Sequence, residues 1–142
     1  MTNVKLTQDL IDLNMSFVNK DEAIRFCGEK LFKAGCIESG YIDKMIERDK
    51  MVSVYIGNNI AIPHGTDEAR SLVKKSGICL CQVPKGVAFG EETANILFGI
   101  AGIGDEHLEI LQKIAIFCSD INNVKKLIAA KSKFEIINLI SF

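Results

Sequence analysis

The hydrophobic pattern of this sequence changes several times between the period of a helix and that of a strand. Apolar residues recur at helical spacing over 21–34, whereas they alternate or run together over 51–62, 77–83 and 94–101. Helical spacing returns after residue 105 and continues toward the end of the chain. Because helical and extended segments alternate, we expect an α/β fold, with a small mixed β-sheet flanked by helices on both faces.

Capping residues predict where the helices begin. Asn, Ser and Asp accept hydrogen bonds from the free N–H groups of a first helical turn, and a Glu three positions later strengthens the signal. Helix starts of this kind are found at Asn19 with Glu22, Ser39, Asp105, Asp120 and Ser132 with Glu135. The first of these helices should cover 21–34, the second should end near Arg48, and the last should cover 134–140. The run Pro84-Lys85-Gly86 predicts a turn that ends the strand over 77–83.

Length and charge narrow the class of protein. The chain has 142 residues, and we expect one domain over 1–142. It carries 17 Lys and Arg against 18 Asp and Glu, so it lacks the basic surplus with which nucleic-acid-binding proteins neutralise phosphates. No apolar segment near the start predicts a signal peptide, and the longest nearly apolar run, 96–104, is about half of the ~18 residues that a membrane helix needs. We therefore expect a cytoplasmic protein with no nucleic-acid partner.

The five cysteines have neither the spacing of a disulfide framework nor that of a metal site. On a strand, the thiols of Cys79 and Cys81 would point to the same face. A metal site needs two further ligands, and no second cysteine pair or closely spaced histidine pair supplies them. We expect reduced cysteines that pack as small apolar side chains, and no metal.

The two histidines lie at the boundaries of predicted elements. His64 follows the extended segment 60–62 and precedes a predicted helix start at Thr66 and Asp67. In open α/β folds, ligands bind where strands end and helices begin, so His64 is either part of a site or a loop histidine without a function. His107 lies in the first turn of the helix that Asp105 opens, where the helix dipole should keep its imidazole neutral. A solvent-exposed histidine without a function is the alternative there.

Other nucleophile motifs are missing from the sequence. It contains no Gly-x-Ser-x-Gly segment and no phosphate-binding loop of the Walker type, which leaves histidine as the candidate nucleophile. Arg48 stands in the last turn of its helix, a position that helix capping alone explains.

Three segments, in this order, resemble the enzyme IIA proteins of the mannitol/fructose class of the bacterial phosphoenolpyruvate-dependent sugar phosphotransferase system. They are 55–66 (YIGNNIAIPHGT), 77–90 (GICLCQVPKGVAFG) and 98–108 (FGIAGIGDEHL). The mannitol branch is the most similar, because its members share the Gly-Thr pair after the histidine and the P-x-G-V-x-F-G segment. The fold that this resemblance implies is a mixed sheet between helices, in agreement with the pattern of periods.

The resemblance implies a phosphotransferase component that works as a relay without a cofactor. His64 would accept a phosphoryl group from the carrier protein HPr and pass it to a cysteine in the IIB domain of a sugar permease, with mannitol as the expected sugar. His107 and Thr66 would hold the phosphoryl oxygens, and Arg48 would add a fixed positive charge. Partner proteins would dock on an apolar surface for which Ile103, Val87 and Phe89 are the candidates.

Two other functions compete with this one. The same type of domain can act as a regulatory module that is controlled by phosphorylation and binds a partner without feeding a permease. A zinc-dependent or hydrolytic enzyme that uses both histidines is the third candidate, but the sequence offers no third ligand at a suitable spacing.

Overall fold

The computed structural model describes residues 4–140, and its centre is a five-stranded sheet with the order β1-β4-β5-β3-β2. The β1–β4 and β3–β5 pairs are parallel, while β4–β5 and β2–β3 are antiparallel, so the predicted mixed sheet is confirmed. The strands are β1 (Ile11–Asp12), β2 (Tyr55–Gly57), β3 (Ile60–Ala61), β4 (Gly77–Phe89) and β5 (Glu92–Ala101).

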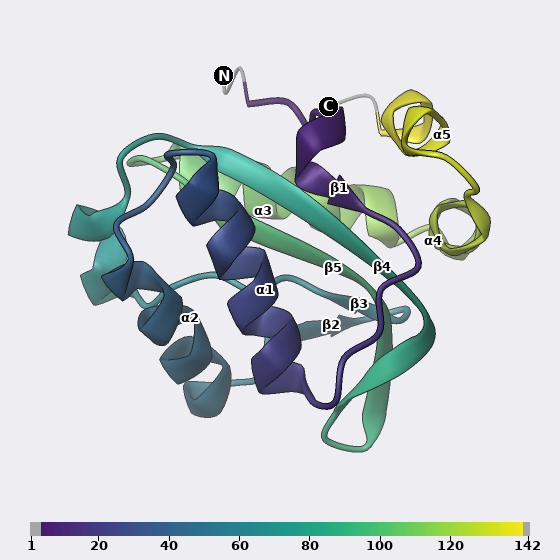
Figure 1. Cartoon of the computed structure of the whole chain (residues 1–142), viewed down its shortest axis with the longest axis horizontal. Coiled ribbons are helices and arrows are strands. Elements are labelled where there is room, and N and C mark those ends of the chain that lie inside the picture. The colour runs from purple at the N-terminus through teal and green to yellow at the C-terminus, as the bar shows by residue number, and fades with distance from the viewer. Residues whose placement is uncertain (1–3, 141–142) are drawn as a thin grey trace.

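Helices cover both faces of this sheet, as the sequence predicts (Figure 1). Helices α1 (Lys20–Lys33) and α2 (Gly40–Met51) pack on one face. The other face is covered by α3 (Glu106–Cys118), α4 (Ile121–Ala129) and α5 (Lys133–Leu139). Two short 3₁₀ helices, η1 (Gln8–Leu10) and η2 (Asp67–Leu72), lie in the connections. Within residues 4–140, no helix is long and apolar enough to cross a membrane.

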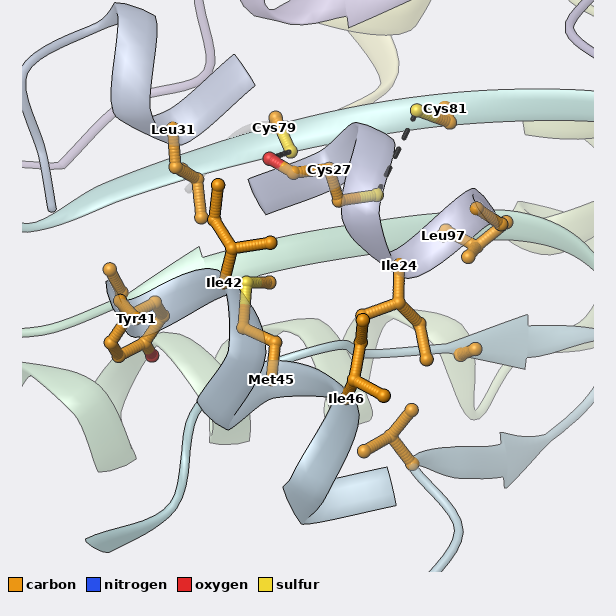
Figure 2. Close-up of a cluster of buried hydrophobic side chains, with 14 of the residues drawn as sticks. Ile24, Cys27, Leu31, Tyr41, Ile42, Met45, Ile46, Cys79, Cys81 and Leu97 are labelled. Carbon is orange, nitrogen blue, oxygen red and sulfur yellow. Dashed lines mark hydrogen bonds between the residues drawn. The ribbon is translucent and has the colours of Figure 1, made fainter. Parts of the chain in front are cut away.

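The alternation of side chains along β4 divides the core into two clusters. Cys79 and Cys81 point to the face under α1 and α2, whereas Ile78 and Leu80 point to the face under α3 and α4. In the first cluster the Cys27 and Cys81 sulfurs are 3.9 Å apart (Figure 2). All five cysteines are free and buried, so their predicted packing as reduced, apolar side chains is confirmed.

Three of the predicted helix caps are confirmed by their hydrogen bonds. The side chains of Asn19, Asp120 and Ser132 accept hydrogen bonds from first-turn N–H groups at 2.9, 2.9 and 3.1 Å. Ser39 and Asp105 precede α2 and α3, but neither side chain caps its helix. The helices therefore begin within a residue or two of the predicted positions even where the capping bond is absent.

The predicted turn at Pro84-Lys85-Gly86 is wrong. Strand β4 continues through these residues to Phe89, and its register against β5 shifts between Gln82 and Val87. The Asn95 side-chain amide donates to the carbonyl oxygens of Val83 and Pro84, at 3.0 and 3.1 Å, in place of the regular ladder. A proline and a glycine can stand in a strand at such a bulge, because the missing backbone bonds are replaced locally.

Candidate functional site

Parallel pairing of β3 and β5 brings the two histidines together. His64 follows the end of β3, and His107 lies in the first turn of α3, just after the end of β5. The carboxyl ends of parallel neighbours meet at the same edge of a sheet. The pairing extends past β3, since the Ile100 N–H donates to the Pro63 carbonyl at 3.0 Å. The His64 and His107 ring centroids are consequently 5.2 Å apart.

Tyr41 of α2 fixes the loop that carries His64. Its hydroxyl donates to the Ile100 carbonyl at 3.2 Å and accepts from the Gly65 N–H at 2.8 Å. Gly65 is required by this contact, because a Cβ there would lie 2.5 Å from the tyrosine ring. Sequence reasoning missed Tyr41. The available signal was that a tyrosine at a buried helix position needs a partner for its hydroxyl.

The hydrogen bond of His64 defines which nitrogen is nucleophilic. His64 is 8% exposed, and its Nδ1 lies 2.7 Å from the Ile62 carbonyl oxygen. Because a carbonyl only accepts hydrogen bonds, Nδ1 must carry the proton, and Nε2 keeps its lone pair in the neutral ring. Burial lowers the pKa of His64 below its ordinary value of 6.5, and the Arg48 charge acts in the same direction. The ring is therefore neutral at pH 7, with Nε2 free to attack.

His107 is also neutral at pH 7, as the sequence predicts, but for another main reason. Burial is the largest cause that lowers its pKa from 6.5 to about 4, and the neighbouring His64 and the Arg70 and Arg48 charges add to it. The half-buried imidazole can thus donate one hydrogen bond without carrying a charge. Arg70, at the end of η2, is a second cation near the histidines that sequence reasoning missed.

Close approach at Gly102 brings His107 to this position. A Cβ on Gly102 would lie 2.4 Å from the His107 Cα, so only glycine lets the end of β5 pass directly beneath the first turn of α3. The Ser76 hydroxyl fixes the loop between them. It accepts from the Ile103 N–H at 2.9 Å and donates to Glu106 Oε1 at 2.6 Å.

Thr66 lies beside His64 with an unusual side chain. The residue is 7% exposed, and its Oγ1 is buried without a hydrogen-bond partner within residues 4–140. Thr66 precedes η2, yet its hydroxyl does not cap that helix. The predicted helix after His64 is only this six-residue 3₁₀ turn. Buried hydroxyls are nearly always paired, so the Thr66 hydroxyl has a hydrogen bond left to make within the site.

Arg48 and Thr66 line the same pocket of about 270 Å³, together with Met51, Glu47, Asp67 and Glu68. The Arg48 guanidinium is held there by its Nη1, which donates to the Val52 carbonyl at 2.7 Å. The structure thus brings all four predicted site residues, His64, His107, Arg48 and Thr66, to one end of the sheet. Within residues 4–140, no group of three His, Cys, Asp or Glu side chains is placed to hold a metal ion.

Two of the three residues predicted to form a docking surface are not on the surface. Val87 and Phe89 are 4% and 3% exposed, and both pack in the cluster under α1 and α2. They belong to the same cluster as Cys79 and Cys81, so side chains at even separations along β4 share one face on both sides of the bulge. Ile103, in contrast, is 47% exposed and stands next to the first turn of α3.

Comparison with known proteins decides the family. Residues 5–142 match the family described as "Phosphoenolpyruvate-dependent sugar phosphotransferase system, EIIA 2". The chain belongs to this family. Its members are IIA components, relay proteins of a phosphotransferase system, as the resemblance of the three segments implies.

Individual relatives agree over nearly the whole chain. The chain is 62% identical over 135 residues to the mannitol-specific phosphotransferase enzyme IIA component of Enterococcus faecalis, covering 92% of this chain and 93% of that one. An NMR structure of a complex of enzyme IIAMtl and phosphorylated enzyme IIBMtl from Escherichia coli matches with a TM-score of 0.92 and 37% identity, covering 96% and 97%. The crystal structure of IIA mannitol from Escherichia coli matches with a TM-score of 0.90 and 38% identity, covering 96% and 99%.

Proposed function

We propose that this protein is the IIA phosphocarrier of a mannitol phosphotransferase system, with His64 as the phosphoryl acceptor. The observation that supports the acceptor is the hydrogen bond of His64, whose Nδ1 proton is engaged by the Ile62 carbonyl while Nε2 keeps its lone pair. In the transfer from phospho-HPr, the P–N bond of the donor histidine breaks as the Nε2–P bond of His64 forms. The ring stays bonded to Ile62 throughout, so no proton has to leave His64 before the attack.

The groups around His64 suit a transferable phosphoryl group. The Arg48 guanidinium supplies one fixed charge, and the orphaned Thr66 hydroxyl and the neutral His107 imidazole supply hydrogen bonds to phosphoryl oxygens. Phosphoryl transfer depends on such positioning and on electrostatic stabilisation more than on covalent chemistry by the protein. No step needs a metal ion or cofactor bound to this chain.

The partners and the sugar follow from the relatives. The 62% identical relative is named as mannitol-specific, and a similar structure is a complex with phosphorylated IIBMtl. We therefore assign the IIB domain of a mannitol permease as the acceptor of the phosphoryl group, through a cysteine, and HPr as its donor. In this role the chain works as one domain over 1–142 in the cytoplasm, where phospho-HPr is available. These relatives favour transport over a regulatory module.

Phosphorylation in a reconstituted system tests this function. Incubation with phosphoenolpyruvate, the first enzyme of the system and HPr should add one phosphoryl group, which peptide mass spectrometry should place on His64. The label should be acid-labile and alkali-stable, as a phosphoramidate is. His107→Ala is the matched control, because it should still be labelled at His64. Labelling of His64→Ala by phospho-HPr would refute the assignment.

A chase with the IIB domain separates a carrier from a regulator. Label on the wild-type protein should move to the IIB cysteine within a single turnover. Label that stays on His64 when IIB is added would support the regulatory module instead.

A further inference from the structure

Asp49 is a buried carboxylate that the proposed relay does not use. It is 3% exposed and lies in the last turn of α2, directly after Arg48. A negative charge is unfavourable at this end of a helix, where the dipole is negative, and burial adds a desolvation cost. The Lys20 ammonium, 2.8 Å from Asp49 Oδ2, offsets part of that cost. Asp49 thus carries two energetic costs, the repulsion from the helix dipole and the loss of solvation. We therefore ask which groups its carboxylate holds in place.

One oxygen of Asp49 starts a chain of hydrogen bonds that ends at the nucleophile. The Val54 N–H donates to Asp49 Oδ1 at 3.0 Å. The carbonyl of the same Val54 accepts from the Ile62 N–H at 2.9 Å. The Ile62 carbonyl then accepts from His64 Nδ1 at 2.7 Å. Val54 and Ile62 are thus each held on both sides, between a buried carboxylate and the imidazole.

The Asp49 carboxylate also helps to position the Arg48 guanidinium. Arg48 Nη1 donates to the Val52 carbonyl, in the short connection between α2 and β2 that Asp49 closes by binding Val54. The Val52 N–H donates to the Arg48 carbonyl at 3.2 Å, so Arg48 holds the start of this connection and Asp49 holds its end at Val54. Asp49 is therefore linked both to Arg48, in α2, and to His64, which follows β3.

We infer that Asp49 is a positioning residue of the phosphoryl relay, which through Val54 orients both the His64 imidazole and the Arg48 guanidinium. Lys20 keeps the buried carboxylate in place from the start of α1. The kinetic consequence rests on the proposed function, but the structural consequence does not, because the orientation and tautomer of His64 can be observed without any phosphoryl group.

NMR of the imidazole nitrogens in the unphosphorylated protein tests the structural part. The wild-type protein should show His64 only as the Nδ1–H tautomer, because the nitrogen that is bonded to Ile62 keeps the proton. In Asp49→Ala, which removes the acceptor for Val54, the Nε2–H tautomer should appear as well. A wild-type protein with His64 in the Nε2–H form would overturn the inference without any variant.

Single-turnover transfer from phospho-HPr tests the kinetic part. Asp49→Ala should lower the maximal rate about tenfold to a hundredfold, the range that misplaced reacting groups cost, and leave the phospho-HPr concentration that gives half of that rate unchanged. Asp49→Asn, which keeps an oxygen for the Val54 N–H, should recover most of the rate. If Asp49→Ala does not fold, Asp49→Leu fills the volume without an acceptor and should show the same loss.

Asp12→Ala is the matched control. It makes the same chemical change in another lysine-paired carboxylate, 3.4 Å from Lys30 Nζ, on the edge strand β1 away from the site. It should leave both the rate and the His64 signals unchanged. A folded Asp49→Ala protein with wild-type rate and wild-type His64 signals would overturn the inference. If wild-type label is found elsewhere than on His64 while the tautomer still responds to Asp49→Ala, the proposed function fails and the positioning role stands.

Discussion

Replacing Tyr41 by Phe removes one oxygen that holds the His64 loop against β5. The hydroxyl makes two hydrogen bonds, from the Gly65 N–H at 2.8 Å and to the Ile100 carbonyl at 3.2 Å, and Tyr41 itself is 2% exposed. The space that the missing oxygen leaves is too small for a water molecule. The buried Gly65 N–H and the buried Ile100 carbonyl therefore each lose a hydrogen-bond partner. Each such loss costs about 1–3 kcal/mol, the carbonyl less than the N–H. We expect Tyr41→Phe to lose about 2–3 kcal/mol of unfolding free energy, which corresponds to about 5–10 °C in Tm.

The same change should slow phosphorylation of His64. With Gly65 released, the imidazole samples more positions, and the rate of transfer from phospho-HPr should fall by at least about tenfold. Urea unfolding and single-turnover labelling, measured well below Tm, separate the two effects. Tyr55→Phe is the matched control, because its hydroxyl accepts from the Asn59 N–H at 3.0 Å in the turn between β2 and β3. It should lose about 1 kcal/mol and keep the wild-type rate. Wild-type stability and rate in Tyr41→Phe, or equal slowing in both variants, would refute this account.

Three further outcomes are expected. Arg48→Ala should slow transfer about a hundredfold in single-turnover labelling, with little change in the urea midpoint, because the charge acts on the transition state. Thr66→Val should slow transfer but leave the protein as stable as wild type or more stable, because it removes an unpaired buried hydroxyl. Stability should fall as pH drops from 6.5 toward 4: the unfolded His107 takes up a proton that the folded one, with a pKa of about 4, refuses. The full shift corresponds to about 3 kcal/mol, which solvent screening of this half-buried ring reduces to about 1–2 kcal/mol. The measurement is the difference between urea midpoints at pH 7 and pH 4.5, which should be smaller in His107→Gln.

Local signals predicted most elements of the fold, because local forces set their ends. The caps at Asn19, Asp120 and Ser132 each act within a few residues, and the structure shows the corresponding bonds. The turn at Pro84–Gly86 was predicted from equally local signals, and it failed because the decisive partner is remote in sequence. The Asn95 amide, on the opposite strand, donates to the Val83 and Pro84 carbonyls.

The sequence identified single residues of the candidate site but not how they are arranged in space. His64 and His107 stand out in the sequence as histidines at element boundaries, but no local pattern says that β3 and β5 are neighbours. Only the sheet order brings their carboxyl ends together. Tyr41 and Asp49 were missed for the same reason. Each lies within a helix, and its role comes from partners outside that helix, Ile100 and Gly65 for Tyr41 and Val54 for Asp49.

In the proposed relay, burial explains how the site would bind a phosphoryl group and still release it. A cationic donor adds Coulomb attraction to its hydrogen bond with a phosphoryl oxygen, and a neutral donor does not, so a cluster of cations around His64 would hold the group too firmly for a relay. The structure keeps His107 uncharged by burying it, with a pKa of about 4, and within residues 4–140 limits the nearby positive charges to Arg48, anchored by the Val52 carbonyl, and Arg70. The same burial keeps His64 neutral and nucleophilic. A single environment, made where β3 and β5 end, therefore serves both acceptance of the phosphoryl group and its onward transfer.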